Sequence, residues 1–288
     1  MKKVFNLLVL CFFLSSYAQT ISPSQLQKND WVNKNLNFLK FYKDSVTYNL
    51  AGKKHTLYYE LAGKLLTFKE KFAVGGTDLR EEKISMKIAS LSKDKLVLTS
   101  VEDVLSFDQE IFYKLDYAPF FSRDKFVFSN RENQVDYIDY KKITFHASTC
   151  FGTCPSFSLE INRGGELHYQ GRIYAKEYTG DFEGFLEREE RIVLHKIINR
   201  SLLPAIDATW QQRSRPTDTP RYTYIIELRN GDKMEINTND QHPLLDNLSS
   251  YLLDITNKLK LTKSKEKHRF DRPSLYGFEI VAGTSDDD

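Results

Sequence analysis

The sequence predicts two folded domains: an all-β, barrel-like N-terminal domain and an α+β C-terminal domain built from an antiparallel sheet with two helices. One change in pattern along the chain supports this division. Residues 28–135 carry a series of short strand-like segments separated by turns, whereas residues 141–262 combine strand patterns with two amphipathic helical stretches. We therefore expect an all-β domain over 19–140 and an α+β domain over 141–262.

The first residues have the layout of a secretory signal peptide. Lys2 and Lys3 precede an apolar run, and small or polar residues follow it up to Ala18. We expect cleavage after residue 18, although an N-terminal membrane anchor is the alternative. The apolar run is too short to span a bilayer by itself. Cys11 follows Leu10, where a lipidation signal requires a small residue. No later run reaches membrane length, so we expect no membrane span in the mature chain. The predicted location is the periplasm, the cell surface or the medium.

The balance of positive and negative charges argues against nucleic acid as a partner. The chain has 41 Lys and Arg against 39 Asp and Glu, and removing Lys2 and Lys3 leaves 39 of each sign. A neutral chain offers no general electrostatic attraction for nucleic acid. We expect an unknown protein or small ligand as the partner. We also expect no cofactor and no catalytic residues, because the sequence has no phosphate-binding glycine loop, nucleophile elbow or His-Glu-x-x-His motif.

The N-terminal domain is expected to be an antiparallel barrel or sandwich. Its segments are four to nine residues long and rich in Leu, Val, Ile, Phe and Tyr, with short turns such as "AGKK" and "SKDK" between them. In "SMKIASL" and "KLVLTS" apolar and polar residues alternate, as in a half-buried strand. The expected strands are "NLNFLKFY", "DSVTYNL", "HTLYYEL", "KLLTFKEKF", "KISMKIASL", "DKLVLTS", "EIFYKLDY" and "KFVFSN".

This region also resembles the small bacterial lipocalin-like domains. The resemblance rests on "NDWVNKNLNFLKF", where Trp31 precedes the first strand, and on "KIASLSKDKLVLTS". It implies a barrel or half-barrel, in some cases with an apolar cavity. The aromatic residues can then fill the interior themselves, or the barrel can carry an apolar ligand.

The C-terminal domain is expected to run strand, hairpin, helix, hairpin, helix. "KKITFHAS" is the strand, and "SFSLEI" and "ELHYQG" form the first hairpin, with Phe157, Leu159 and Ile161 on one face. A helix is expected within 179–203, capped by Asp181 and with Phe182, Phe185, Leu186, Val193 and Ile197 at helical spacing. Asn230-Gly231 marks the second hairpin. The last helix spans 242–261, with an apolar stripe of Leu244, Leu245, Leu248, Leu252, Ile255 and Leu259.

A loose tail is expected over 263–288. It begins with the basic stretch "KSKEKHRFDR" and ends "GTSDDD". Within it, "SLYGFEIVAG" is suited to a further strand in either domain.

One loop of the C-terminal domain carries a recognisable signature. The stretch "TCFGTCPSFSLEINRGGELHYQG", the following helix, "PTDTP" and the closing helix resemble a family of bacterial domains of unknown function with a Cys-Phe-Gly-x-Cys-Pro loop. The loop residues Cys150, Phe151, Gly152, Cys154 and Pro155 carry the match. Gly165, Tyr169 and Gly171 match the hairpin, and Asp218 lies in the matching later loop. The resemblance implies a domain identity and no mechanism.

The cysteine pair admits three interpretations. A structural disulfide is favoured because an exported chain can keep an oxidised pair and because a glycine turn brings the two residues close. A redox pair usually lies at a helix N-terminus or beside a cation that lowers the thiolate pKa, and no Lys or Arg lies between His146 and Glu160. The same Cys-x-x-x-Cys-Pro motif is similar to that of the Sco copper chaperones, which implies Cys150, Cys154 and His168 as metal ligands. However, in that family the motif opens a helix, whereas here a strand pattern follows.

The sequence therefore favours an exported, non-catalytic binding or scaffold protein with a structural disulfide. Its candidate binding loop consists of Phe151, Gly152, Pro155 and Asp218. A thiol-redox or copper-handling protein is one alternative, and a carrier of an apolar ligand in the N-terminal barrel is another.

Overall fold

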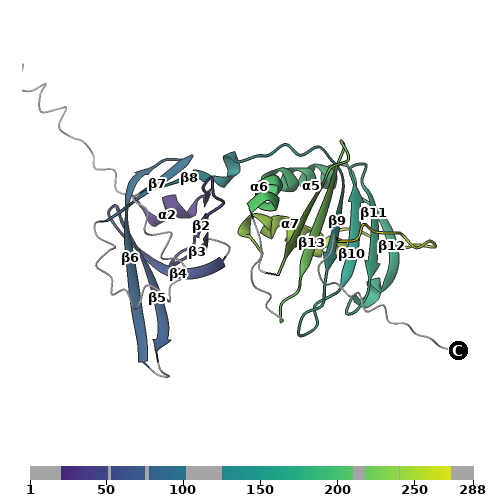
Figure 1. Cartoon of the computed structure of the whole chain (residues 1–288), viewed down its shortest axis with the longest axis horizontal. Coiled ribbons are helices and arrows are strands. Elements are labelled where there is room, and N and C mark those ends of the chain that lie inside the picture. Colours follow the sequence, from purple (N-terminus) through teal and green to yellow (C-terminus); the bar gives the residue numbers. More distant parts are fainter. Residues whose placement is uncertain are drawn as a thin grey trace, which may run out of the picture. The chain divides into compact units, whose positions relative to one another are not determined.

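Two folded units make up the described part of the chain (Figure 1). A computed structural model describes residues 21–50, 53–74, 78–101, 125–209, 218–239 and 241–273. The division along the chain falls between Arg131 and Glu132. The predicted leader, the predicted strand "EIFYKLDY" and the predicted late strand "SLYGFEIVAG" lie outside the described residues.

The first unit is a closed antiparallel barrel of eight strands, which confirms the predicted all-β barrel. Strand β1 pairs with both β2 and β8, and the β1–β8 pairing closes the sheet on itself. The strands are β1 (Asp30–Val32), β2 (Phe38–Phe41), β3 (Ser45–Leu50), β4 (Lys53–Ala62), β5 (Leu65–Val74), β6 (Asp78–Leu91), β7 (Lys95–Ser100) and β8 (Lys125–Asn130).

Alternating apolar residues supply the core of the barrel. Met86 and Ile88 on β6 and Leu96 and Leu98 on β7 are all buried, as the alternation in the sequence predicted. Trp31 lies within β1 rather than before the first strand, and it is fully buried. Its indole N–H donates to the Leu26 carbonyl at 3.0 Å, which ties β1 to the short helix α2 (Pro23–Gln27). The buried tryptophan therefore keeps its one polar group satisfied.

The second unit is built on a seven-stranded antiparallel sheet in the order β14-β13-β9-β10-β11-β12-β15. Both predicted hairpins are present, and β9 lies between them. The strands are β9 (Tyr140–Ala147), β10 (Phe157–Asn162), β11 (Glu166–Gly171), β12 (Gly180–Phe185), β13 (Tyr222–Leu228), β14 (Lys233–Thr238) and β15 (Thr262–Lys263).

One face of this sheet forms the core under the helices. Phe157, Leu159 and Ile161 of β10 are buried on this face, as predicted. Leu159 and Tyr224 both lie opposite Phe145 of the central strand β9. Figure 1 shows α5 (Arg188–Arg200), α6 (Leu203–Thr209) and α7 (Asp246–Leu253) gathered on one side of the sheet. Within the described residues, none of the helices has the length and apolar character needed to cross a bilayer.

The first predicted helix begins later than expected. Residues 180–185 form the strand β12, and α5 starts at Arg188 after Glu187. The predicted cap Asp181 instead pairs with Gln170 across the sheet. Gly180 and Gly184 disfavour a helix there, and a Cβ on Gly184 would stand 2.7 Å from the Leu261 side chain. Phe182 and Phe185 are spaced as on a helix, but both lie on the strand β12.

The buried face of α5 differs from the predicted one, and the predicted last helix is not continuous. Leu194 and Ile198 face the core, whereas Val193 is 47% exposed. Leu202 adopts a φ of +49°, which ends α5, and Pro204 lies in the first turn of α6. The predicted last helix is divided into η4 (Pro243–Leu245), α7 and α8 (Ile255–Lys258). Its predicted apolar stripe is buried from Leu244 to Ile255.

The segment after α8 continues along the sheet. The sequence suggested a loose tail from residue 263, but β15 pairs with the edge strand β12, and residues 264–273 contact the face of the sheet opposite the helices. We call residues 264–273 the strap. The tail pattern is highly charged, so composition did not indicate this packing.

Candidate functional site

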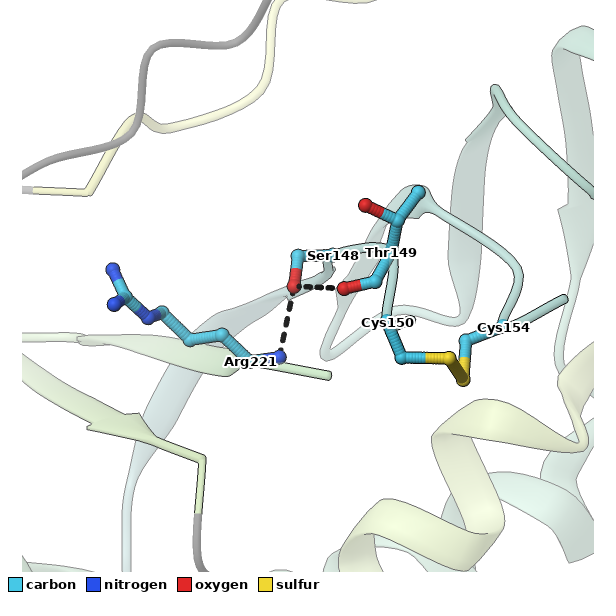
Figure 2. Close-up of a disulfide and its surroundings, with 5 residues drawn as sticks. All are labelled: Ser148, Thr149, Cys150, Cys154 and Arg221. Atoms are coloured by element: carbon cyan, nitrogen blue, oxygen red, sulfur yellow. Dashed lines mark hydrogen bonds between the residues drawn. A yellow bond between two sulfur atoms is a disulfide. The ribbon is translucent and has the colours of Figure 1, made fainter. Parts of the chain in front are cut away.

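The predicted cysteine pair forms a disulfide that closes the loop between β9 and β10 (Figure 2). The Cα atoms of Cys150 and Cys154 are 5.5 Å apart, within the span that a disulfide requires. Gly152 lies inside the closed loop with a φ of +155°, a conformation that residues with a side chain rarely adopt. The glycine therefore permits the tight turn that the bridge needs.

Hydrogen bonds fix both ends of this loop. At the β9 end, the Ser148 hydroxyl oxygen accepts from the Arg221 backbone N–H at 2.8 Å (Figure 2). The Ser148 N–H in turn donates to the Arg221 carbonyl at 2.9 Å. At the β10 end, the Arg172 N–H donates to the Ser156 carbonyl at 2.8 Å. The loop thus leaves the sheet from two paired positions.

The loop displays an aromatic side chain to solvent. Phe151 is 90% exposed, and Gly152 and Pro155 are exposed beside it. The Phe151 N–H lies 3.4 Å from the Asp218 carbonyl oxygen, to which it donates a hydrogen bond. The four residues of the predicted binding loop are therefore all exposed, and the main chain brings two of them together.

The predicted third metal ligand belongs to another cluster. His168 lies on β11, where its ring stacks on His268 of the strap with the ring centroids 3.8 Å apart. The sulfur atoms of Cys150 and Cys154 are bonded to each other, so neither is a thiolate ligand in this state. In the part of the chain that the structure describes, no three His, Cys, Asp or Glu side chains are grouped so as to hold a metal ion.

A polar network lies under the strap on the face opposite the helices. His146 Nε2 lies 2.8 Å from the Asp271 carbonyl oxygen, which can only accept, so this nitrogen carries the proton. His146 Nδ1 then accepts from the Ser158 hydroxyl at 2.7 Å. Arg172 donates to the Ser158 oxygen at 2.8 Å. The hydrogen bonds run in one direction from the guanidinium through serine and histidine to the strap.

Ionic contacts reinforce the same attachment. The carboxylate of Asp271 lies 3.2 Å from Lys142 Nζ and 3.0 Å from Lys233 Nζ. His268 Nε2 lies 3.1 Å from Glu160, a buried carboxylate that also accepts from Lys142 at 3.0 Å. The strap is thus attached to side chains of three neighbouring strands and of the edge strand β14.

The pKa shifts in this network follow from burial and charge. Burial lowers the pKa of His146, and the Arg172 charge lowers it further, against the hydrogen bond to Asp271. Burial works to raise the pKa of Asp271, but its two lysine partners outweigh it, and the net shift is downward. Burial works to lower the pKa of Lys142, but its bonds to Glu160 and Asp271 raise it overall. At neutral pH the His146 imidazole is therefore uncharged, while the Asp271 carboxylate and the Lys142 ammonium are both charged.

The Ser158 and His146 pair is enclosed rather than open to a substrate. Ser158 is fully buried, and His146 Nε2 is already hydrogen-bonded to the carbonyl of Asp271 in the strap. In this arrangement the cluster fastens the strap to the sheet. Sequence reasoning missed it because it joins residues more than a hundred positions apart. The available signal was weak: His268 and Phe270 stand inside an otherwise charged tail.

Comparisons with known proteins show a similarity within the second unit. No similar protein was found among curated proteins. Residues 141–256 match the family described as "Domain of unknown function (DUF6438)", which confirms the predicted similarity to a family of domains of unknown function. The matched residues include the disulfide loop, the strands β10 to β14 and the helices α5 to α7.

Proposed function

We propose that this chain is an exported, non-catalytic binding or scaffold protein whose disulfide-closed loop presents Phe151 to a protein partner. The observation that carries the proposal is the 90% exposure of Phe151 on a loop that is closed by a covalent bond. The leader-like pattern of residues 1–18 supports export, and export supports a lasting disulfide.

An exposed aromatic ring on a constrained loop is suited to recognition. Aromatic side chains supply much of the binding energy at protein interfaces, because they bury a large apolar area on contact. A loop that is already fixed loses less conformational freedom when it binds. The bridge between Cys150 and Cys154, together with the hydrogen bonds of Ser148, provides this constraint.

A role without catalysis is supported by the state of the reactive groups. The two thiols are joined, and the Ser158 and His146 pair is enclosed by the strap. These groups stabilise the fold in the arrangement described. The exposed surface of the loop, in contrast, is available for contact with a partner.

Site-specific photo-crosslinking tests the proposal. A photoreactive phenylalanine analogue replaces Phe151 in the full chain, expressed in the native host. A matched chain carries the analogue at Tyr58, which is 59% exposed on β4 of the barrel. We expect a discrete adduct of one protein from position 151 that is absent from position 58. The same adducts from both positions, or none from position 151, would contradict the proposal.

Thiol chemistry separates this function from the redox and copper alternatives. A structural disulfide should resist reduction by the glutathione pool, whereas a catalytic pair has a higher potential and is reduced readily. The readout is the alkylation state of Cys150 and Cys154 after equilibration with glutathione buffers. Ready reduction, or copper bound stoichiometrically by the reduced chain, would favour the alternatives.

A further inference from the structure

A basic groove lies at the end of the sheet opposite the disulfide loop. It has a volume of about 610 Å³ and lies among residues 135–140, the β10–β11 turn and α5. Tyr140 begins β9 and Arg163 follows β10, whereas the disulfide loop joins the other ends of these two strands. The volume falls within the usual range for small-ligand sites of roughly 300–1,000 Å³.

Five cationic side chains line the groove, and no carboxylate is among its described lining residues. Arg163 pairs with Asp139, and Arg200 pairs with Glu132. The other three cations have no ion-pair partner within the described residues: Arg188, Arg191 and Lys196. These three lie at i, i+3 and i+8 on α5, which places them along one side of the helix. Like charges around one concave surface repel each other, and a bound anion would relieve that repulsion.

The groove also has an exposed aromatic side chain on a fixed backbone. Tyr137 is 90% exposed, yet the residues on both sides of it are tied to α5. The Asp136 N–H donates to the Asn199 carbonyl at 2.9 Å. The Ile138 N–H donates to the Asn199 side chain at 3.0 Å. Because the backbone is fixed in this way, a ligand that contacts the ring does not have to order this segment first.

The floor of the groove combines rings with positive charge. The Arg163 guanidinium lies 5.8 Å from the centroid of the Tyr140 ring, and the Tyr140 and His195 rings lie 5.9 Å apart. Burial lowers the pKa of His195, and the charge of Arg163 lowers it further. The imidazole is therefore neutral at pH 7 and contributes a ring surface rather than a sixth charge.

We propose that this groove binds a phosphomonoester attached to a ring or short apolar body, with the phosphate on the α5 cations and the body against Tyr137 and Tyr140. Arginine presents paired N–H groups that match phosphate oxygens, and a phosphomonoester carries close to two negative charges at neutral pH. The apolar surface of Val135 and Ile192 completes the space for the body of the ligand. The site is distinct from the disulfide loop, so this inference does not depend on the proposed function.

Titration calorimetry on the mature full chain tests the proposal with phenyl phosphate as the probe. Inorganic phosphate tests the charge alone, and phenol tests the ring alone. We expect phenyl phosphate to bind more tightly than either, with an affinity that falls as salt is added. Vesicles of phosphatidylcholine with and without phosphatidic acid form a further arm. Binding to the vesicles that contain phosphatidic acid would extend the site to a lipid head group, and binding of phenyl phosphate alone would restrict it to soluble ligands.

Matched variants show whether the groove is the binding site. The double variant R188E/K196E reverses two exposed cations of the groove. The control K64E/K260E makes the same change of charge at exposed lysines outside the groove. We expect R188E/K196E to weaken phenyl phosphate binding at least about tenfold and the control to leave it unchanged. Y137A should weaken phenyl phosphate binding but leave inorganic phosphate binding unchanged. Absence of phenyl phosphate binding at millimolar concentration, or equal losses in both double variants, would overturn the proposal.

Discussion

Replacing Cys150 and Cys154 together by serine should destabilise the second unit by about 2 kcal/mol. The bridge joins residues four positions apart, so it closes a loop of five residues in the unfolded chain. The loop-closure relation gives an entropy change of about −7 cal/mol/K for a loop of this size, which is about 2 kcal/mol at 25 °C. The serine side chains should fit because both cysteines are only half-buried, so the constraint on the unfolded chain is the main loss.

Hydrogen exchange measured by mass spectrometry can assign this loss to one unit. A change of 2 kcal/mol corresponds to about thirtyfold faster exchange for amides that exchange through unfolding of the second unit. Peptides from β10 should show this increase, whereas peptides from β5 of the barrel should not. The wild-type chain kept in reductant should behave like the serine variant. Exchange in β10 that stays within about twofold of the oxidised wild type would refute the reasoning.

Three further predictions concern the leader, the strap and the pH dependence of stability. Intact mass of the exported protein should correspond to a chain that begins near Gln19, and retention of Met1 would contradict export through a cleaved leader. The substitution Asp271→Ala removes both lysine contacts of the strap and should cost about 1 kcal/mol, with earlier protease cleavage within 264–273. Unchanged cleavage of that variant would mean that the ion pairs do not hold the strap. Stability should also fall as the pH drops below the ordinary histidine pKa of 6.5, because the folded state holds three imidazoles at a lower pKa and the unfolded chain binds more protons there. Urea unfolding at several pH values measures this dependence of the unfolding free energy on pH. The dependence should be weaker in His146→Asn, and an unfolding free energy of the wild type that does not change with pH would contradict this assignment.

Local signals in the sequence predicted most of the sheet structure. The alternation of Phe157, Leu159 and Ile161 predicted which face of β10 is buried on the core. Asn230-Gly231 predicted the hairpin of β13 and β14, and Gly231 has the positive φ of +93° that such a turn uses. These signals are reliable because each depends only on neighbouring residues.

The helix boundary and the strap could not be predicted in the same way. Phe182 and Phe185 fit a helical period as well as a strand, and pairing with the distant strand β11 decides between them. Ser158 and Glu160 have the polar character of a solvent-facing strand surface, but the strap and the neighbouring strands bury both of them. A polar face covered by a charged segment leaves no hydrophobic pattern, so only the contacts themselves show it.

The candidate site was predicted in part. The disulfide was the favoured of three interpretations of the cysteine pair, on the cysteine spacing, the glycine turn and the expected export. The groove could not be predicted from the sequence, because its cations lie on α5 and in the β10–β11 turn, some 25 positions apart in the chain. Each basic residue alone is ordinary for a solvated surface. Their joint placement beside Tyr137 depends on the fold of the second unit.

The affinity of the Phe151→Ala variant for the protein that crosslinks to position 151 tests the central claim most directly. Burying an exposed phenylalanine side chain at an interface contributes roughly 1.5–3 kcal/mol, which corresponds to about ten- to a hundredfold in affinity. The matched control is Phe185→Ala, because Phe185 is also an exposed aromatic of the second unit, 50% exposed on β12. We expect Phe151→Ala to lose affinity in that range, with a stability within about 0.5 kcal/mol of the wild type, while Phe185→Ala binds normally. Equal affinity of the Phe151→Ala variant and the wild type would contradict a binding role for the loop.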